Sequence, residues 1–375
     1  MPFRIEPVRN AKDLHAFVTF PWKLYANDPA WVPPLIGETK KLFKPESNPF
    51  FAHGEIEPYL ARIDDRVVGR IAGIRNRIHE DFHHEPVGFF GFFECEDNVE
   101  VAMGLLSTVR SFLRTRKLER MLGPVNPSTN DECGLLVDGF QYPPMVMMSH
   151  ALPYYGPLLE RCGLVKAKDL FAYYLEGDHP PEKLSQAAAM VEKRLPDVRL
   201  RPIDKKRLDQ EVEVFKTIYN QSWEKNWGFV PMTEAEIEHM AKQLKQVLDP
   251  ALVRIAEKDG KPVAIALGLP DINVAMKHAN GRLFPVGLLK ILWYARKIKR
   301  MRLLALGVLP EFRKTGIDVL LYHSIFKDGT AKGYGAGEFS WILEDNLAIR
   351  RPIERIGARH YKTYRIYEAP VEPAV

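Results

Sequence analysis

The feature that most constrains this chain is a repeat of its own sequence. Residues 4–8 (RIEPV) return as residues 199–203 (RLRPI), 195 positions later. A hairpin pattern at 59–74 returns at 252–267, 193 positions later, and residues 159–163 (LERCG) return as 353–357 (IERIG), 194 positions later. Three separate elements at nearly one spacing indicate a tandem duplication. With 375 residues, the chain is long enough for two domains.

Each half has the same predicted order: strand, helices, hairpin, strand, helix, strand, helix, strand. This order predicts an α/β fold, with a mixed sheet covered by helices on both faces. We expect an N-terminal domain over residues 1–176, a linker with a helix over 177–197, and a C-terminal domain over 198–375. The linker opens with the breaker cluster Gly177-Asp178-His179-Pro180-Pro181.

Composition narrows the class of protein. With 46% hydrophobic and 27% charged residues, the chain is typical of a globular protein. Its net charge of +5 suits an anionic cofactor or membrane surface, and it is too weak to indicate nucleic acid binding. Three cysteines, the absence of an apolar leader at the N-terminus and the lack of a membrane-length apolar run predict a cytoplasmic protein.

A strand-to-helix connection in the second half has the properties of a phosphate site. The apolar run 303–309 turns at Pro310, passes Arg313, Lys314 and Gly316, and enters an apolar helical pattern near Val319. The free N–H groups and the dipole at a helix N-terminus favour an anion, and the two cations add to this. An ordinary βα connection is the alternative interpretation.

This connection resembles the acyl-CoA motif of the GNAT N-acyltransferases, Arg/Gln-x-x-Gly-x-Gly/Ala. Arg313 and Gly316 match it, whereas Asp318 replaces its last small residue. A second motif of the family is matched at Asn346 and Gly357, but Ile353 stands where the family often has a catalytic tyrosine. The resemblance implies two tandem GNAT-like domains and binding of acyl-CoA by the residues Gly307, Val308, Arg313, Lys314, Thr315, Gly316, Ile317 and Asn346.

The first half lacks this motif. At the corresponding place Glu94, Glu96 and Asp97 precede the helix, and three carboxylates would repel a pyrophosphate. We therefore expect one acyl-CoA site per chain, in the second half, and no metal.

Acyl transfer from a thioester to an amine needs a base, because an ammonium has no lone pair. Glu344 and Asp345, at the end of a predicted strand over 338–343, are the candidates; helix capping is their alternative role. By resemblance, a backbone N–H near Gly307 or Val308 would stabilise the oxyanion. Tyr361 is the candidate to protonate the leaving thiolate.

Four further stretches allow a functional or a structural interpretation. His79-Glu80-Asp81-Phe82-His83 matches a zinc motif, but we predict a polar loop. The basic, apolar stretch 284–300 predicts a peripheral membrane contact or a packed helix. The polar run 126–134 predicts an acceptor pocket or a surface loop, and the aromatic run 223–229 predicts an acceptor site or core.

The sequence predicts an acyl-CoA-dependent N-acyltransferase acting on a primary amine. The runs at 123–130 and 226–229 resemble a bacterial group of tandem GNAT proteins related to bacterial ceramide synthases, which implies a long acyl chain and a sphingoid-type lipid amine. Acetylation of a small soluble amine and a degenerate acyl-CoA-binding module are the alternatives. The localisation expected is cytoplasmic, peripheral at the inner membrane face, and the sequence leaves oligomeric state and acyl length open.

Overall fold

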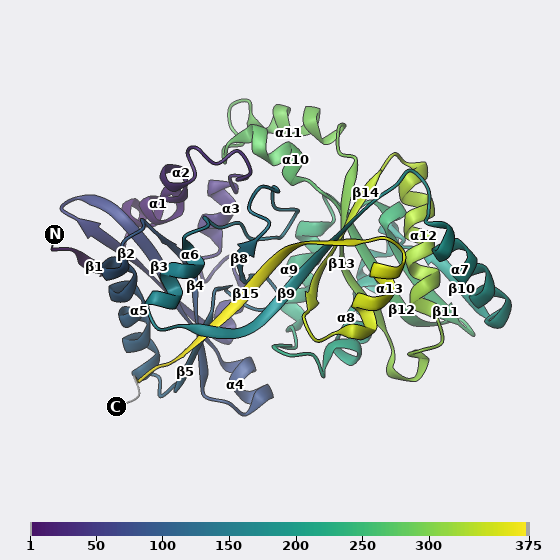
Figure 1. Ribbon diagram of the computed structural model, residues 1–375, viewed down its shortest axis with the longest axis horizontal. Helices are drawn as coiled ribbons and strands as arrows, with labels where there is room; N and C mark the ends of the chain where they lie inside the picture. Colours follow the sequence, from purple (N-terminus) through teal and green to yellow (C-terminus); the bar gives the residue numbers. More distant parts are fainter. Residues whose placement is uncertain (1, 373–375) are drawn as a thin grey trace. The chain divides into compact units, whose positions relative to one another are not determined.

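The computed structural model describes residues 2–372, which form two compact units (Figure 1). Within the described residues, unit 1 comprises 2–170, 275–293 and 362–372, and unit 2 comprises 171–274 and 294–361. The units therefore differ from the two sequence halves. A segment of the second half, 275–293, belongs to unit 1, and so does the C-terminal segment.

Unit 1 is built on a sheet whose first strands follow chain order. These are β1 (Arg4–Pro7), β2 (Gly54–Ile63), β3 (Arg66–Asn76), β4 (Val87–Cys95) and β5 (Arg120–Gly123). The end of β15 (Arg359–Pro370) pairs antiparallel with β5, from Tyr367↔Gly123 to Pro370↔Arg120, and with β8 (Leu135–Asp138). The last strand of the chain thus completes the sheet of unit 1.

Helices cover this sheet. α5 (Val99–Arg114) is amphipathic, begins at the Asn98 cap and packs its buried face on β3 and β4. The remaining elements of unit 1 are α1 (Ala11–Thr19), α2 (Pro21–Leu24), α3 (Ile36–Lys41), η1 (Pro49–Ala52), α4 (Arg77–His83), β6 (Val125–Asn126), β7 (Glu132–Cys133) and α6 (Tyr155–Arg161). α10 (Asn273–Met276), η4 (Lys277–Ala279) and α11 (Gly287–Ala295) belong mostly to this unit.

One local prediction for unit 1 is wrong. Residues 79–83 lie in helix α4 rather than in a loop, because the Asn76 side chain accepts a hydrogen bond from the His79 N–H (3.3 Å) and caps the helix. His79 is buried, which lowers its pKa to about 3, with His83 contributing.

Unit 2 repeats the plan. Its sheet has the order β10 (Val198–Pro202), β11 (Val253–Lys258), β12 (Lys261–Pro270), β13 (Arg300–Val308) and β14 (Ala336–Leu343), with β13 and β14 parallel. β9 (Val165–Glu176) runs from unit 1 into unit 2. The helices are α7 (Glu182–Arg194), α8 (Leu208–Trp223), α9 (Glu234–Leu244), α12 (Ile317–Ala331) and α13 (Leu347–Arg355), with short turns η2 (Lys205–Arg207), η3 (Pro250–Leu252) and η5 (Pro310–Phe312).

The sheet of unit 2 has a different core on each face. Small side chains such as Ala256 and Ala264 pack under α12 on one face. Ile255 and Ile265 point to the other face and pack against Ile218 of α8. α7, the predicted linker helix, lies beside α12, which it contacts through Val191 (Figure 1). The sheet of unit 2 is thus buried between helices on both sides.

The described residues hold neither a membrane span nor a metal cluster. No helix within residues 2–372 is long and apolar enough to cross a membrane. In the same range, no three His, Cys, Asp or Glu side chains gather as metal ligands.

Candidate functional site

The centre of unit 2 is the place where β13 and β14 stop pairing. Their parallel pairing runs from Arg300↔Ala336 to Leu303↔Phe339, while β13 continues to Val308 and β14 to Leu343. At this point β13 also carries a bulge, since Leu267 pairs with Ala305 but Gly268 pairs with Leu303, leaving Leu304 as the extra residue. Parted strands leave backbone hydrogen-bonding groups available for a ligand.

The pairing with β12 shows which groups these are. The Leu309 N–H donates to the Val263 carbonyl (3.0 Å), on the β12 side. Because N–H groups alternate along a strand, those of Gly307 and Ala305 also face β12, whereas those of Leu306 and Val308 face the opening towards β14. Of the two predicted oxyanion donors, Val308 has this orientation. The sequence could not show it, since it depends on the bulge at Leu304.

Trp223 marks the α8 side of this opening. A Cβ built on Gly307 would lie 2.5 Å from the Trp223 ring, so α8 packs directly on the bare backbone of β13. The same end of α8 holds the predicted cofactor loop, because Arg313 donates to the Ser222 carbonyl (2.9 Å). In the predicted aromatic run, Trp223 therefore lines the β13 backbone and Phe229 is core, while Trp227 is 37% exposed.

The predicted phosphate loop leads into the N-terminus of α12. Gly316 is the N-cap residue and has φ +95, a left-handed conformation that glycine tolerates without strain. It offers no capping side chain, so the first N–H groups of α12 lack a side-chain acceptor from the N-cap. Arg313 and Lys314 are exposed beside them. Thr315 donates its hydroxyl to Phe312, and Ile317 is buried in the core.

A third cation comes from α7. Arg194 donates to the carbonyl of Thr315, and a Cβ at Gly316 would meet Val191 at 2.7 Å. The linker helix α7 therefore packs against the loop that precedes α12 and stabilises it. Sequence reasoning missed Arg194, because only the packing of α7 on α12 brings it there.

Asp318, the departure from the motif, lies in the first turn of α12. Burial raises the pKa of its carboxyl, and hydrogen bonds from the Val319 N–H and from its own N–H act in the opposite direction. The carboxyl thus meets N–H groups of its own helix. A raised pKa shifts the acid towards its neutral form, which weakens its repulsion of a phosphate.

The candidate bases lie where the sequence placed them, in the turn between β14 and α13. Glu344 is half-buried and its carbonyl accepts a hydrogen bond from Arg350, while Asp345 is exposed. The Asn346 side chain accepts from the Ile349 N–H (3.3 Å) and caps α13. All three follow the parted end of β14, and Ile353 is a buried residue of α13.

Tyr361 belongs to a buried polar cluster that sequence reasoning missed. Its hydroxyl donates to Glu338, and the hydroxyl of Ser340 donates to the other carboxylate oxygen (2.6 Å). The Arg302 guanidinium donates to the Ser340 hydroxyl (2.8 Å) and lies 3.8 Å from the Glu338 carboxylate. Arg302 and Glu338 are 1% and 0% exposed. Little in the sequence indicated it, since Arg302 lies just before the predicted apolar run 303–309 and Glu338 is the first residue of the predicted strand 338–343.

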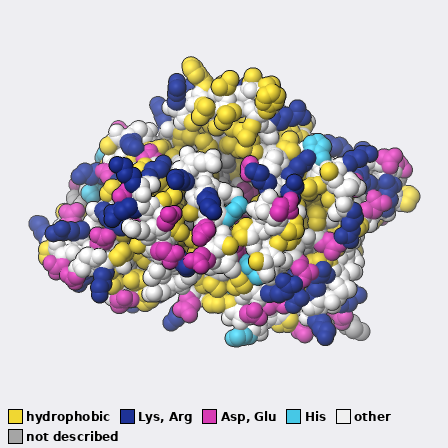
Figure 2. Space-filling view, turned by 180° about the vertical axis from the view of Figure 1, so that it is seen from behind, with side chains coloured by type: hydrophobic (Ala, Val, Ile, Leu, Met, Phe, Trp, Pro, Cys, Tyr) yellow, Lys and Arg dark blue, Asp and Glu magenta, His cyan; other side chains and the backbone are white. Residues whose placement is uncertain are grey.

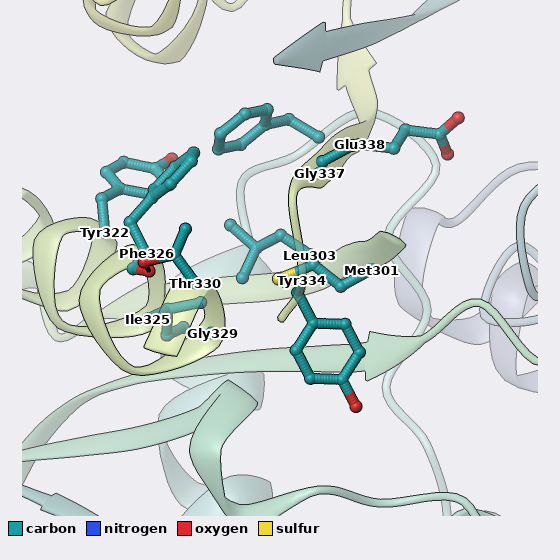
Figure 3. Close-up of a pocket in the computed structure, with 12 residues that line it drawn as sticks. Met301, Leu303, Tyr322, Ile325, Phe326, Gly329, Thr330, Tyr334, Gly337 and Glu338 are labelled. Carbon is teal, nitrogen blue, oxygen red and sulfur yellow. Dashed lines mark hydrogen bonds between the residues drawn. The ribbon is translucent and has the colours of Figure 1, made fainter. Parts of the chain in front are cut away.

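A small apolar cavity lies on the opposite side of these strands (Figure 3). Its volume is about 30 Å³, and Leu303, Tyr322 and Phe326 are among the residues that line it. Glu338 points away from the rings of Tyr322 and Phe326 (Figure 3). The cavity is a packing gap under α12, with room for little more than water.

Unit 1 contains the counterpart of the opening, but its own chain fills it. β4 and β5 pair only from Val87↔Arg120 to Phe89↔Leu122, and β4 carries an extra residue between Gly91 and Glu94. The Phe92 N–H at this bulge donates to Asn126 Oδ1 (2.6 Å). A Cβ at Gly91 would lie 2.0 Å from the Val125 carbonyl, so only glycine allows this approach.

The same segment corrects the surface-loop prediction for residues 126–134. Ser128 is 4% exposed and Cys133 is 5% exposed, because the segment forms the β6–β7 hairpin at the bulge of β4. The segment is therefore mostly buried or half-buried in unit 1, with Glu132 exposed.

The carboxylates expected to repel CoA in unit 1 all have partners. Glu94 is buried, which raises its pKa, and it accepts hydrogen bonds from Tyr155 (2.6 Å) and Tyr25 (3.0 Å). Glu96 pairs with Lys23 (2.7 Å), and Asp97 pairs with Arg161 (2.9 Å). Filling of the opening is thus a stronger physical reason against a ligand in unit 1 than net negative charge.

Comparison with solved structures defines the fold class. A tandem GNAT protein from the clavulanic acid biosynthesis pathway matches over 100% of both chains, with a TM-score of 0.59 and 11% identity. A GCN5-related N-acetyltransferase from Sphaerobacter thermophilus matches with a TM-score of 0.54 and 12% identity, over 100% of this chain and 97% of the other. The predicted fold, two tandem GNAT-like domains, is confirmed.

No protein-family model matches the chain, but two curated relatives do. The bacterial ceramide synthase of Caulobacter vibrioides is 39% identical over 372 residues, 96% of each chain. Protein YghO of Escherichia coli is 34% identical over 370 residues, 96% of this chain and 94% of its own. The chain belongs to the family of these two proteins, and the resemblance to bacterial ceramide synthases is confirmed.

Proposed function

We propose that this protein is an N-acyltransferase that moves the acyl group of acyl-CoA to the primary amine of a lipid. The observation that carries the proposal is the bulged, parted end of β13, which offers backbone donors beside the glycine-capped, basic N-terminus of α12. The GNAT fold and the relative named bacterial ceramide synthase support it. Acyl-CoA would bind with its pyrophosphate at Gly316 and its thioester at the opening.

The residues of unit 2 supply the chemistry of this transfer. Glu344 or Asp345 takes a proton from the amine, whose nitrogen then bonds to the thioester carbon. The Val308 N–H stabilises the oxyanion while the carbon–sulfur bond breaks. The thiolate takes up a proton as it leaves. Tyr361 is a weak candidate donor, because its hydroxyl proton is already donated to Glu338.

A lipid acceptor is supported by the surface of the inserted segment. Hydrophobic side chains gather over α11 in unit 1, at the top of the view in Figure 2. Phe284 is 86% exposed, Leu289 66% and Trp293 60%, and Arg282 and Lys290 are exposed among them. Exposed apolar side chains mixed with cations fit an anionic membrane surface. Peripheral membrane contact through 284–300 is therefore part of the proposal.

The test is product formation. Purified protein is incubated with palmitoyl-CoA and either sphinganine or lysine, and the amide is measured by mass spectrometry together with release of the CoA thiol. We expect amide from sphinganine. Amide from lysine alone would support acyl transfer to soluble amines instead. Binding of palmitoyl-CoA without any amide would support a degenerate acyl-CoA-binding module.

A further inference from the structure

Unit 2 has an apolar cavity that the proposed chemistry does not use. It lies between helices α8 and α9 and the strands β11 and β12, with a volume of about 70 Å³. Val212 and Phe215 of α8, Met240 and Ala241 of α9, and Ile265 of β12 are among its lining residues. Several of these side chains are only half-buried, so the cavity opens to solvent.

The floor of the cavity adjoins the candidate acyl site. Ile265 is the cross-strand partner of Gly307, and Leu267 is the partner of Ala305. The cavity therefore lies one strand away from the bulged end of β13, on the sheet face that α8 covers.

A row of three aromatic side chains on α8, Phe215, Tyr219 and Trp223, connects the cavity with the opening at β13. Phe215 lines the cavity and stacks on Tyr219, with ring centroids 5.5 Å apart. Tyr219 lies 4.8 Å from Trp223, which packs against Gly307. The spacing of four residues keeps the three rings on one side of α8. An apolar surface thus runs from the opening at β13 into the cavity.

The lining contains one charged residue, Glu211. Its Oε1 atom accepts from Arg201 (2.6 Å) and from the Asp204 N–H (3.2 Å). Its Oε2 atom is buried without a hydrogen-bond partner in the described part of the chain. A buried acceptor of this kind calls for a water or a ligand hydroxyl. The other lining side chains are apolar, which selects against a charged or compact polar ligand.

We propose that this cavity is the binding site for the alkyl chain of a long-chain substrate. The proposal rests on the proposed function. It adds that this cavity sets the length of alkyl chain that the enzyme prefers. An alkyl chain matches the lining in chemistry, because it is flexible and apolar along its length. Its end would occupy the cavity, while the rest of the chain follows the row of rings from the thioester or the amine. Acyl-CoA and the lipid amine both carry such a chain, and they are distinguished by experiment.

The test is to fill the cavity from α9. Ala241→Phe places a ring in it, while Ala235→Phe adds the same ring at an exposed position of the same helix as the matched control. Calorimetry measures binding of palmitoyl-CoA, acetyl-CoA and sphinganine, each alone. We expect Ala241→Phe to weaken the binding of one long-chain compound at least tenfold and that of acetyl-CoA less than twofold. Ala235→Phe should leave the binding of all three compounds unchanged.

Loss of palmitoyl-CoA binding assigns the cavity to the acyl chain, and loss of sphinganine binding assigns it to the acceptor. If both long-chain compounds bind Ala241→Phe as they bind the control, the proposal is wrong. Retained acetyl-CoA affinity shows that the variant is folded. Met240→Ala, which enlarges the cavity, should shift the preferred chain to a greater length. These binding results do not depend on turnover, so failure of the proposed acyl transfer would appear separately, as absence of amide.

Discussion

Asn126 Oδ1 accepts a hydrogen bond from the Phe92 N–H at 2.6 Å, at the bulge where β4 of unit 1 parts from β5. In unit 2 the corresponding bulge is at Leu304, where the N–H groups of Leu306 and Val308 face the opening. In unit 1 the N–H at the bulge is thus bonded to a side chain of the same unit, while in unit 2 the N–H groups of Leu306 and Val308 face the opening. This difference is our reason to expect one site per chain, in unit 2.

The first prediction is that each chain binds one CoA, in unit 2. Arg313→Glu should weaken CoA binding at least tenfold, because it reverses a charge beside the N-terminus of α12. Calorimetry should give a stoichiometry near one for the wild type. Arg199→Glu, a charge reversal at an exposed position of β10, is the control and should bind normally. Two equal sites per chain would contradict the prediction.

The second prediction concerns the filled opening of unit 1. Asn126→Ala removes the acceptor of the Phe92 N–H and should lower the free energy of unfolding by about 1–3 kcal/mol. Denaturant unfolding measures this change. The CoA stoichiometry should stay near one, because the Val125 carbonyl still lies against Gly91. A second CoA bound to this variant would show that Asn126 alone closes the site.

The third prediction tests the base. Alanine at Glu344 or at Asp345 should lower turnover at saturating acyl-CoA and remove the acidic limb of the pH–rate profile for one of the two. Both residues lie at the end of β14. Glu238→Ala, at an exposed position of α9, is the control. Full turnover in both variants would mean that the base is a different residue.

The fourth prediction follows from Asp318, whose pKa is raised by burial. Between the unfolded and folded pKa values the folded chain holds a proton that the unfolded chain has released, so stability falls as pH rises through this window. Asp318→Asn should remove that fall and be the more stable protein at neutral pH. Chemical denaturation at pH 4 and pH 7 measures the difference. Asp209→Asn, an exposed first-turn acid of α8, should not show it.

The repeat and the motif at Arg313 and Gly316 were enough to predict the fold class, while the site at the end of β13 stays a prediction. Such signals are local, because periodicity and turn residues are set by neighbours along the chain. The direction of the Val308 N–H was not predictable, since it depends on an extra residue at Leu304 in a strand pairing. Nor was Asn126 as the partner of Phe92, which lies 34 positions away.

The assignment of segment 275–293 to unit 1 could not be predicted either, because it also depends on contacts between residues far apart in the sequence. The segment 275–293 follows β12 in the chain, yet it packs on unit 1, where the Trp22 indole donates to Asn280 (2.9 Å) and the Ile36 N–H donates to the Gly281 carbonyl (3.0 Å). Such contacts join residues more than 240 positions apart. Periodicity predicted the helix within this segment but carried no information on which unit would hold it.

The last prediction concerns the apolar surface over α11. Burial of Leu289, Leu292 or Trp293 in a lipid interface contributes about 1.5–3 kcal/mol each. Each nearby Lys or Arg adds roughly 1 kcal/mol on an anionic surface. Three or four such contacts are enough for reversible association. We therefore expect co-sedimentation with vesicles of anionic lipid, weaker binding at high salt, and faster turnover with long-chain than with short-chain amines.

Leu289→Ser combined with Trp293→Ser should reduce vesicle binding and long-chain turnover together, because both side chains are more than half exposed and their loss removes apolar contact area. The control is Val165→Ser with Met190→Ser, two equally exposed apolar residues outside α11 (60% and 67%). If vesicle binding depends only on the total exposed apolar surface, both double variants should bind vesicles equally weakly. If binding occurs through α11, only Leu289→Ser with Trp293→Ser should lose it. If the wild-type protein does not bind anionic vesicles and prefers a short hydrophilic amine, the surface over α11 is not a membrane contact and the acceptor is not a lipid.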